Sequence, residues 1–116
     1  MTTIDFDKPR PLVYNLAAIR DLERAMDGEP LGVLVNKLAQ LGVNALVMFL
    51  WAGMKHDDRA LTPHLVQVRL ETYLQNGGKI RALADGINDA LEESGLFKTA
   101  ADEQAAAANP STPTSQ

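Results

Sequence analysis

The chain has 116 residues, which fits a single domain, because domains most often contain about 100–150 residues. Hydrophobic residues make up 46% and charged residues 22%, a balance typical of a globular chain rather than a disordered or fibrous one. With 11 basic and 15 acidic residues the net charge is -4, which disfavours a general role in binding nucleic-acid phosphates. The chain has no cysteine, which excludes disulfides, thiolate metal sites and cysteine nucleophiles and agrees with a reducing cytosol.

The first segment, residues 1–14, is expected to be an extended arm. Pro9 and Pro11 forbid a helix there and favour extended backbone or a short edge strand. The segment carries Asp5 and Asp7 and lacks the basic start and apolar stretch of a signal peptide, so export by that route is not indicated.

Two helices are expected next. Asn15 is a good N-cap for the first, which should end near Asp27 and Gly28. Pro30 suits the first turn of the second helix, and Gly42 should stop it. Both segments carry apolar residues at helical spacing.

The third expected helix, capped by Asn44, has no charged residue from Ala45 to Met54. A helix that is apolar all round is normally buried on all sides. Ten residues span only about 15 Å, half of the apolar thickness of a bilayer. The sequence therefore predicts a core helix rather than a membrane-spanning one.

Two more helices follow. Thr62 as N-cap with Pro63 at the first helical position is the clearest helix start in the chain. Residues 76–78, Asn-Gly-Gly, should break this helix, and Gly95 should cap the C-terminus of the fifth. The fifth helix has apolar residues at i, i+3, i+4 and i+7 spacing: Ile80, Leu83, Ala84, Ile87 and Leu91.

The predicted fold class is all-α: a compact bundle of about five short helices with a short extended N-terminal arm. We expect residues 1–97 to form the helical domain. Residues 98–116 can bury too little apolar surface to offset the conformational entropy lost on ordering, so they are expected to be a disordered tail. Alternatively, the alanine run could prolong the fifth helix.

The titratable residues favour no catalytic or metal site. His56 and His64 match no recognised ligand spacing and are expected to be solvated surface residues. The acidic pairs at 57–58 and 92–93 are adjacent residues that do not face each other, so capping and solubility account for them better than acid–base chemistry. We expect no cofactor and no enzymatic activity.

Trp51 is the most informative residue of the third helix. Together with Phe49 and Met54 it is open to two interpretations, core packing or an anchor for a partner, since aromatic and Met side chains are common in interface hot spots. A helix without a polar face in a bundle of short helices needs cover on every side. That cover could include a second subunit or a partner.

The order of these features resembles the small tail assembly chaperones of long-tailed bacteriophages and the similar small tail proteins of gene transfer agents. The resemblance spans about residues 4–97 and rests on pattern, with no catalytic signature. The stretches that carry it are Ile4-Asp5-Phe6-Asp7, Leu12-Val13-Tyr14-Asn15, Ala18-Ile19-Arg20-Asp21-Leu22-Glu23, Leu50-Trp51-Ala52-Gly53-Met54 and Leu61-Thr62-Pro63.

The resemblance implies a non-enzymatic protein that holds the long helical tape measure protein in soluble form while tail tube subunits assemble around it. The implied partners are the tape measure protein and the tail tube protein, with no nucleic acid and no membrane, and homo-oligomerisation stays open. The implied location is the cytoplasm of the bacterial host and not the mature virion. The family has no universal functional residue, so the candidate contact residues are taken from the apolar positions of this chain: Phe49, Trp51, Met54, Leu96 and Phe97.

Three other functions stay open. A small structural virion protein or head–tail joining protein would have a similar sequence. A helix-turn-helix regulator formed by the last two helices is disfavoured, because Lys79 and Arg81 are followed by Asp85, Asp89 and residues 92–93, which would repel phosphates. An enzyme or small-ligand binder lacks a convergent set of titratable groups.

Overall fold

The computed structural model describes residues 2–95, so the tail expected at 98–116 lies outside the described part. Five helices follow a pair of short strands within these residues. The elements are β1 (Thr2–Asp5), β2 (Pro9–Leu12), α1 (Leu16–Ala25), α2 (Leu31–Ala39), α3 (Val43–Met54), α4 (Pro63–Gln75) and α5 (Ile80–Ser94).

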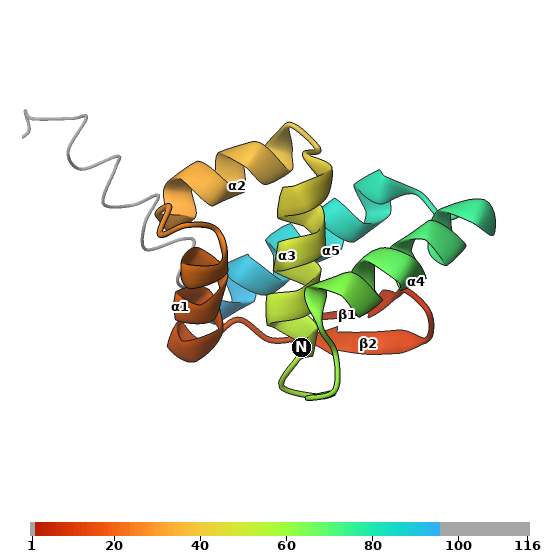
Figure 1. The fold of residues 1–116 in the computed structure, drawn as a ribbon, viewed down its shortest axis with the longest axis horizontal. Coiled ribbons are helices and arrows are strands. Elements are labelled where there is room, and N and C mark those ends of the chain that lie inside the picture. The colour runs from red at the N-terminus through yellow and green to blue at the C-terminus, as the bar shows by residue number, and fades with distance from the viewer. Residues whose placement is uncertain (1, 96–116) are drawn as a thin grey trace, which may run out of the picture.

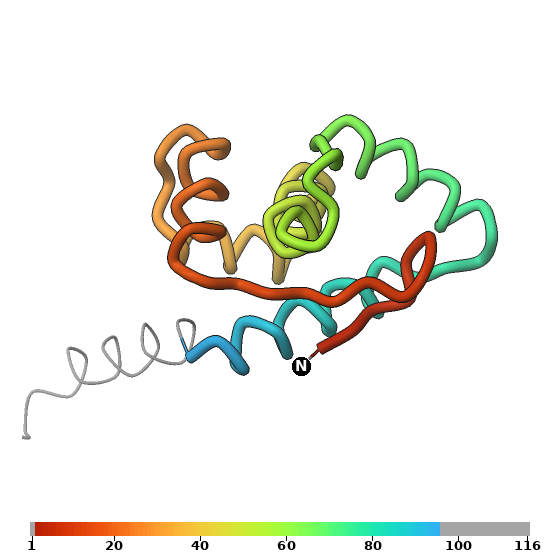
Figure 2. Tube along the Cα trace, turned by 90° about the horizontal axis from the view of Figure 1, so that it is seen from below, coloured from red at the N-terminus to blue at the C-terminus, as the bar shows by residue number. Residues whose placement is uncertain are grey.

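Helix α3 lies at the centre of the fold (Figure 1). Viewed nearly along its axis in Figure 2, it has α1 and α2 on one side and α4 on the other, while α5 and the two strands run beneath it. The helical character agrees with the prediction, but the extended arm is an antiparallel β-hairpin packed on α5 and α3, so the fold is mostly helical rather than all-α. No helix among residues 2–95 is long and apolar enough to cross a membrane.

The hairpin is part of the core rather than a loose arm. In its register Ile4 pairs with Arg10, and Thr2 pairs with Leu12. Ile4, Arg10 and Leu12 are all buried, so one face of the hairpin is covered. A Cβ atom at Gly86 of α5 would lie 2.4 Å from Cγ2 of Ile4, so this close approach of helix and strand requires glycine. The two prolines of β2 fit a two-stranded edge, where they need not donate a hydrogen bond.

Three helix boundaries follow the sequence signals. The Asn15 side chain accepts a hydrogen bond from Ala18 N at 2.8 Å, and the Thr62 hydroxyl accepts one from Leu65 N at 3.1 Å. Gly95 ends α5 with φ of 80°, a left-handed conformation that glycine adopts without strain. The Asn15 and Thr62 side chains each satisfy a backbone N–H group that the first turn of a helix leaves without a partner.

The start of α2 differs from the prediction. Pro30 has an extended conformation and precedes the helix as its N-cap instead of lying in its first turn. Proline offers no side-chain acceptor, and the carboxylate of Glu23 from α1 instead accepts a hydrogen bond from Leu31 N at 2.8 Å. This cap comes from another helix, and no local sequence pattern indicates it.

The start of α3 is also corrected. Asn44 was expected to cap the helix, but it lies within the first turn, and Gly42 is the N-cap. The Gly42 carbonyl already accepts the first helical hydrogen bond, from Leu46 N at 2.9 Å. Helix α3 therefore begins at Val43, two residues before the apolar run that predicted it.

The side of α3 that faces the hairpin is tightly closed. Phe49 has no exposed surface, and the Tyr14 hydroxyl donates a hydrogen bond to the Phe49 carbonyl at 2.6 Å. The two rings meet edge to face with centroids 6.3 Å apart, a favourable arrangement for aromatic pairs. A Cβ atom at Gly53 would lie 2.7 Å from the Tyr14 ring, so this contact too requires glycine. Burial raises the pKa of the Tyr14 hydroxyl far above its ordinary value.

Candidate functional site

The five predicted contact residues separate into three groups. Phe49 and Met54 have 0% exposure and pack inside the chain, so in this conformation neither can touch a partner, and they are core residues. Leu96 and Phe97 lie outside the described residues. Trp51 packs on the edge of the core and keeps part of its surface exposed, so of the three predicted residues within 2–95 it is the one that combines core packing with access to a partner.

Trp51 is held in place at the surface. Its indole Nε1 donates a hydrogen bond to the Leu61 carbonyl at 3.3 Å, which ties α3 to the loop that follows it. Lys55, the C-cap of α3, places its ammonium 5.0 Å from the centroid of the Trp51 ring, within the range of a cation–π interaction. The ammonium also forms an ion pair with Asp21 of α1. The hydrogen bond and the cation–π contact together restrict the orientation of the ring.

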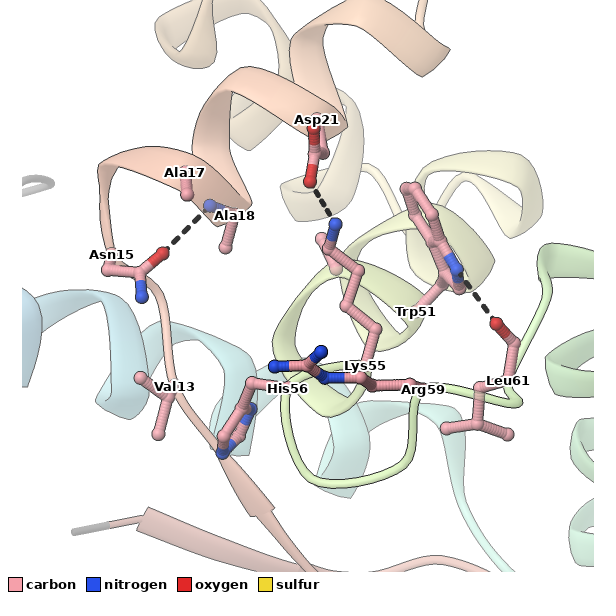
Figure 3. Close-up of a pocket in the computed structure, with 11 residues that line it drawn as sticks. Val13, Asn15, Ala17, Ala18, Asp21, Trp51, Lys55, His56, Arg59 and Leu61 are labelled. Atoms are coloured by element: carbon pink, nitrogen blue, oxygen red, sulfur yellow. Dashed lines mark hydrogen bonds and ion pairs between the residues drawn. The ribbon is translucent and has the colours of Figure 1, made fainter.

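The Trp51 groove is a hollow of about 420 Å³ between α1, the C-terminal half of α3 and the loop after α3 (Figure 3). Figure 3 shows that side chains from segments distant in sequence converge on it. Its lining combines apolar and polar side chains: Val13, Asn15, Ala17, Ala18, Asp21, Trp51, Ala52, Lys55, His56, Arg59 and Leu61. A hollow with an apolar floor and a few polar groups is the usual form of a binding site.

The charged groups of the Trp51 groove are mainly cationic. Lys55 and Arg59 carry positive charge, and Asp21 is the one carboxylate among the lining residues. The hydrogen bond and charge of Lys55 lower the pKa of Asp21 below its ordinary value, so this carboxylate stays ionised. His56 Nδ1 lies 3.0 Å from the Gly53 carbonyl, which can only accept, so this ring nitrogen carries a proton.

A buried charge lies outside the Trp51 groove and has a structural role. Arg10 is 1% exposed, and its guanidinium donates two hydrogen bonds to Asp7, at 2.8 and 2.7 Å, and one to Asp58 at 3.2 Å. Asp7 also pairs with Arg69 of α4. These pairs hold the pKa of Asp7 far below its ordinary range, with the hydrogen bonds from Arg10 as the largest cause. The cluster joins the hairpin, the loop after α3 and α4.

The remaining titratable residues occupy the surface. His56 and His64 are exposed, and no group of three acidic or histidine side chains within residues 2–95 is arranged to hold a metal ion. Of the acidic pairs, Asp58 binds Arg10, and Glu93 accepts a hydrogen bond from the Thr2 hydroxyl at 2.7 Å. Both carboxylates therefore hold the hairpin in place, in addition to the solubility role expected from the sequence.

Sequence reasoning missed most of the groove. Asn15 was identified only as a helix cap, and Asp21, Lys55 and Arg59 were not singled out. The spacing of Trp51 and Lys55, four residues apart on one helix, could have indicated a cation–π pair. Asp21 and Arg59 carried no such signal, because the packing of α1 against α3 brings Asp21 to the groove and the path of the loop after α3 brings Arg59 there.

A second hollow of about 450 Å³ lies between the N-terminal half of α3 and α4. It contains two exposed apolar side chains, Val43 at 58% and Leu74 at 39%. Its charged residue is Glu71, so unlike the Trp51 groove it has no cationic edge.

Comparison of the chain with protein-family models, with curated proteins and with solved structures finds no match in any of the three. The geometry and the residue pattern are therefore the basis for a functional assignment.

Proposed function

We propose that the protein is a non-enzymatic tail assembly chaperone of a long-tailed bacteriophage or prophage, acting in the bacterial cytoplasm. In this proposal it binds the tape measure protein, keeps it soluble while tail tube subunits assemble, and is absent from the finished particle. The observation that supports it is the position of Trp51, a partly exposed aromatic side chain fixed at the edge of a groove.

The shape and composition of the Trp51 groove suit a protein partner better than a reaction. Rigid aromatic side chains with one face accessible are frequent anchors in protein interfaces, because little side-chain entropy is lost when they bind. The hydrogen bond to the Leu61 carbonyl and the contact with Lys55 already restrict the Trp51 ring. The apolar floor can accept one side of an amphipathic helix, the kind of element a long helical partner presents repeatedly.

The proposal is tested by co-expression with the tape measure protein of the same operon. We expect a soluble complex that co-purifies with the full chain. Trp51→Ala should weaken the affinity for the tape measure protein at least about tenfold. Tenfold corresponds to a loss of roughly 1.4 kcal/mol of binding free energy, which is typical of an interface anchor. Val33→Ala is the matched control, because Val33 is an exposed apolar residue of α2 outside the groove.

An insoluble tape measure protein with no recovered complex would contradict the chaperone proposal. The location of the protein provides the second test. Its recovery in stoichiometric amounts from purified particles would instead identify a structural virion or head–tail joining protein.

A further inference from the structure

The edge of the Trp51 groove carries more positive charge than the chain as a whole, whose net charge is -4. Lys55 and Arg59 line the groove, and Arg20 and Arg24 of α1 lie close enough to Asp21 to lower the pKa of its carboxyl. Lys55 and Arg24 are both paired with Asp21, whereas Arg59 is exposed and has no carboxylate partner among residues 2–95. A partner's carboxylate could therefore pair with Arg59 without displacing an existing ion pair.

The N-terminus of α1 adds to this field. Asn15, Ala17 and Ala18, which form the cap and first turn of α1, line the same groove, as Figure 3 shows. The first turn of α1 contains no acidic residue. The positive end of a helix dipole favours a nearby anion; Asn15 already accepts from Ala18 N, but no carboxylate of the same turn neutralises the end.

The floor of the groove is apolar. Val13, Ala52 and Leu61 line it together with Trp51, and their side chains offer no hydrogen-bonding group. A purely anionic ligand such as a phosphate would leave this surface unused. The arrangement fits an apolar side chain on the floor with carboxylates next to it.

We propose that the Trp51 groove binds an acidic amphipathic segment of a partner protein. One aliphatic side chain of the segment packs against Trp51, and flanking glutamate or aspartate side chains pair with Arg59 and face the N-terminus of α1. The inference rests on the proposed function, since it specifies which segments of the tape measure protein the chaperone recognises. It predicts that binding weakens as salt is added, because charges at an exposed edge are screened.

Two synthetic helical peptides test the inference with the full chain. The first has one leucine on its apolar face, flanked by glutamates, and its twin has lysine at each glutamate position. Trp51 is the only tryptophan, so its fluorescence reports occupancy of this groove directly. We expect the glutamate peptide to saturate the signal and the lysine peptide to bind at least about tenfold more weakly, as expected for ion pairs formed or opposed at an exposed edge.

Charge-reversed variants locate the effect. Arg59→Glu should weaken the glutamate peptide about tenfold and reduce the preference over its lysine twin. Arg81→Glu is the matched control, because Arg81 is an exposed residue of α5 outside the groove, and it should bind like the natural chain. Circular dichroism of both variants confirms that the fold is kept.

Equal binding of the two peptides, or unchanged binding by Arg59→Glu, would overturn the inference. A single-stranded oligonucleotide that binds as tightly as the glutamate peptide and moves the Trp51 signal would overturn it too, since phosphates would then suffice. The two proposals fail separately. If the tape measure protein still co-purifies with Arg59→Glu at full yield, only the acidic segment is ruled out; if it never binds the natural chain, the chaperone proposal fails whatever the peptides do.

Discussion

Helix α3 is apolar on every face from Ala45 to Met54, but Phe49 and Trp51 have different surroundings in the structure. On the hairpin side Phe49 and Gly53 are covered by Tyr14 and the strands. On the other side Trp51 and Lys55, also four residues apart, border a groove. Nine of the ten residues from Ala45 to Met54 are buried, which confirms the predicted core helix, and Trp51 is the one residue of this run that keeps partial exposure. The difference between Phe49 and Trp51 is therefore a difference at one position on a covered helix, and the predictions below test it.

The largest expected effect lies on the closed side. Phe49→Ala should lower the free energy of unfolding by about 3–5 kcal/mol, because it removes a fully buried ring and leaves a cavity in a close-packed core. Urea denaturation followed by circular dichroism measures this loss. Val33→Ala, at an exposed site on α2, is the control and should change stability by less than about 0.5 kcal/mol. A loss below about 1 kcal/mol for Phe49→Ala would mean that the closed side is not well packed.

The next effect concerns Arg10, the buried charge that joins the hairpin to the loop after α3. Arg10→Met fills a similar volume but leaves Asp7 and Asp58 without their main partner, so we expect a loss of about 2–3 kcal/mol. This is less than for a fully enclosed pair, because both carboxylates keep some contact with water. Arg59→Met, at the groove, removes a guanidinium with no carboxylate partner in the described residues and should change stability little. Equal losses in the free energy of unfolding for Arg10→Met and Arg59→Met would show that the buried and the exposed arginine contribute alike to the fold.

Local signals predicted the helices well because caps and breakers act within a few residues. Asn15, Thr62 and Gly95 end or begin helices as their chemistry requires. The hairpin was left open as extended backbone or an edge strand, because its pairing partner and the helix that covers it lie elsewhere in the chain. Trp51 was predicted to reach a contact surface from the excess of apolar faces on a short helix, but the same argument included Phe49 and Met54. Only the three-dimensional packing separates the covered positions from the open one.

The cationic edge of the groove and the Arg10 cluster were beyond sequence reasoning for the same reason. Arg10 looks like a surface residue between two prolines, and its burial follows from the hairpin register, which turns it to the same face as Ile4 and Leu12. Lys55 and Asp21 are far apart in sequence and form an ion pair through the packing of α1 on α3. Long-range charge pairs leave no periodic pattern in a single sequence.

Acid should lower the free energy of unfolding, because protonation of Asp7 breaks its ion pairs with Arg10 and Arg69. Its pKa is lowered in the folded chain, so the stability it contributes is fully present above its ordinary pKa of 3.8 and is lost as the pH falls toward the folded value. We expect the urea midpoint of the natural chain to fall between pH 5 and pH 2, with Asp7 contributing on the order of 1–2 kcal/mol. Asp21, Asp58 and Glu93 also have lowered pKa values, so Asp7→Asn should show a shallower fall rather than none. An unchanged acid limb in Asp7→Asn would show that the Arg10 cluster does not stabilise the fold.

The smallest effect on stability is expected when one aromatic side chain loses its hydrogen-bond donor. Tyr14 and Trp51, which lie on different sides of α3, can be compared in this way. Tyr14→Phe removes a buried hydroxyl that donates to the Phe49 carbonyl at 2.6 Å, and we expect a loss of about 1–2 kcal/mol. Trp51→Phe removes the indole donor to the Leu61 carbonyl at 3.3 Å, a longer bond at a partly exposed site where water can replace the donor. It should cost less than about 1 kcal/mol in the free energy of unfolding, measured by circular dichroism because the variant has no tryptophan. If Trp51 serves the partner rather than the fold, this nearly neutral change should still weaken capture of the tape measure protein, whereas Tyr14→Phe, although less stable, should capture it normally while folded.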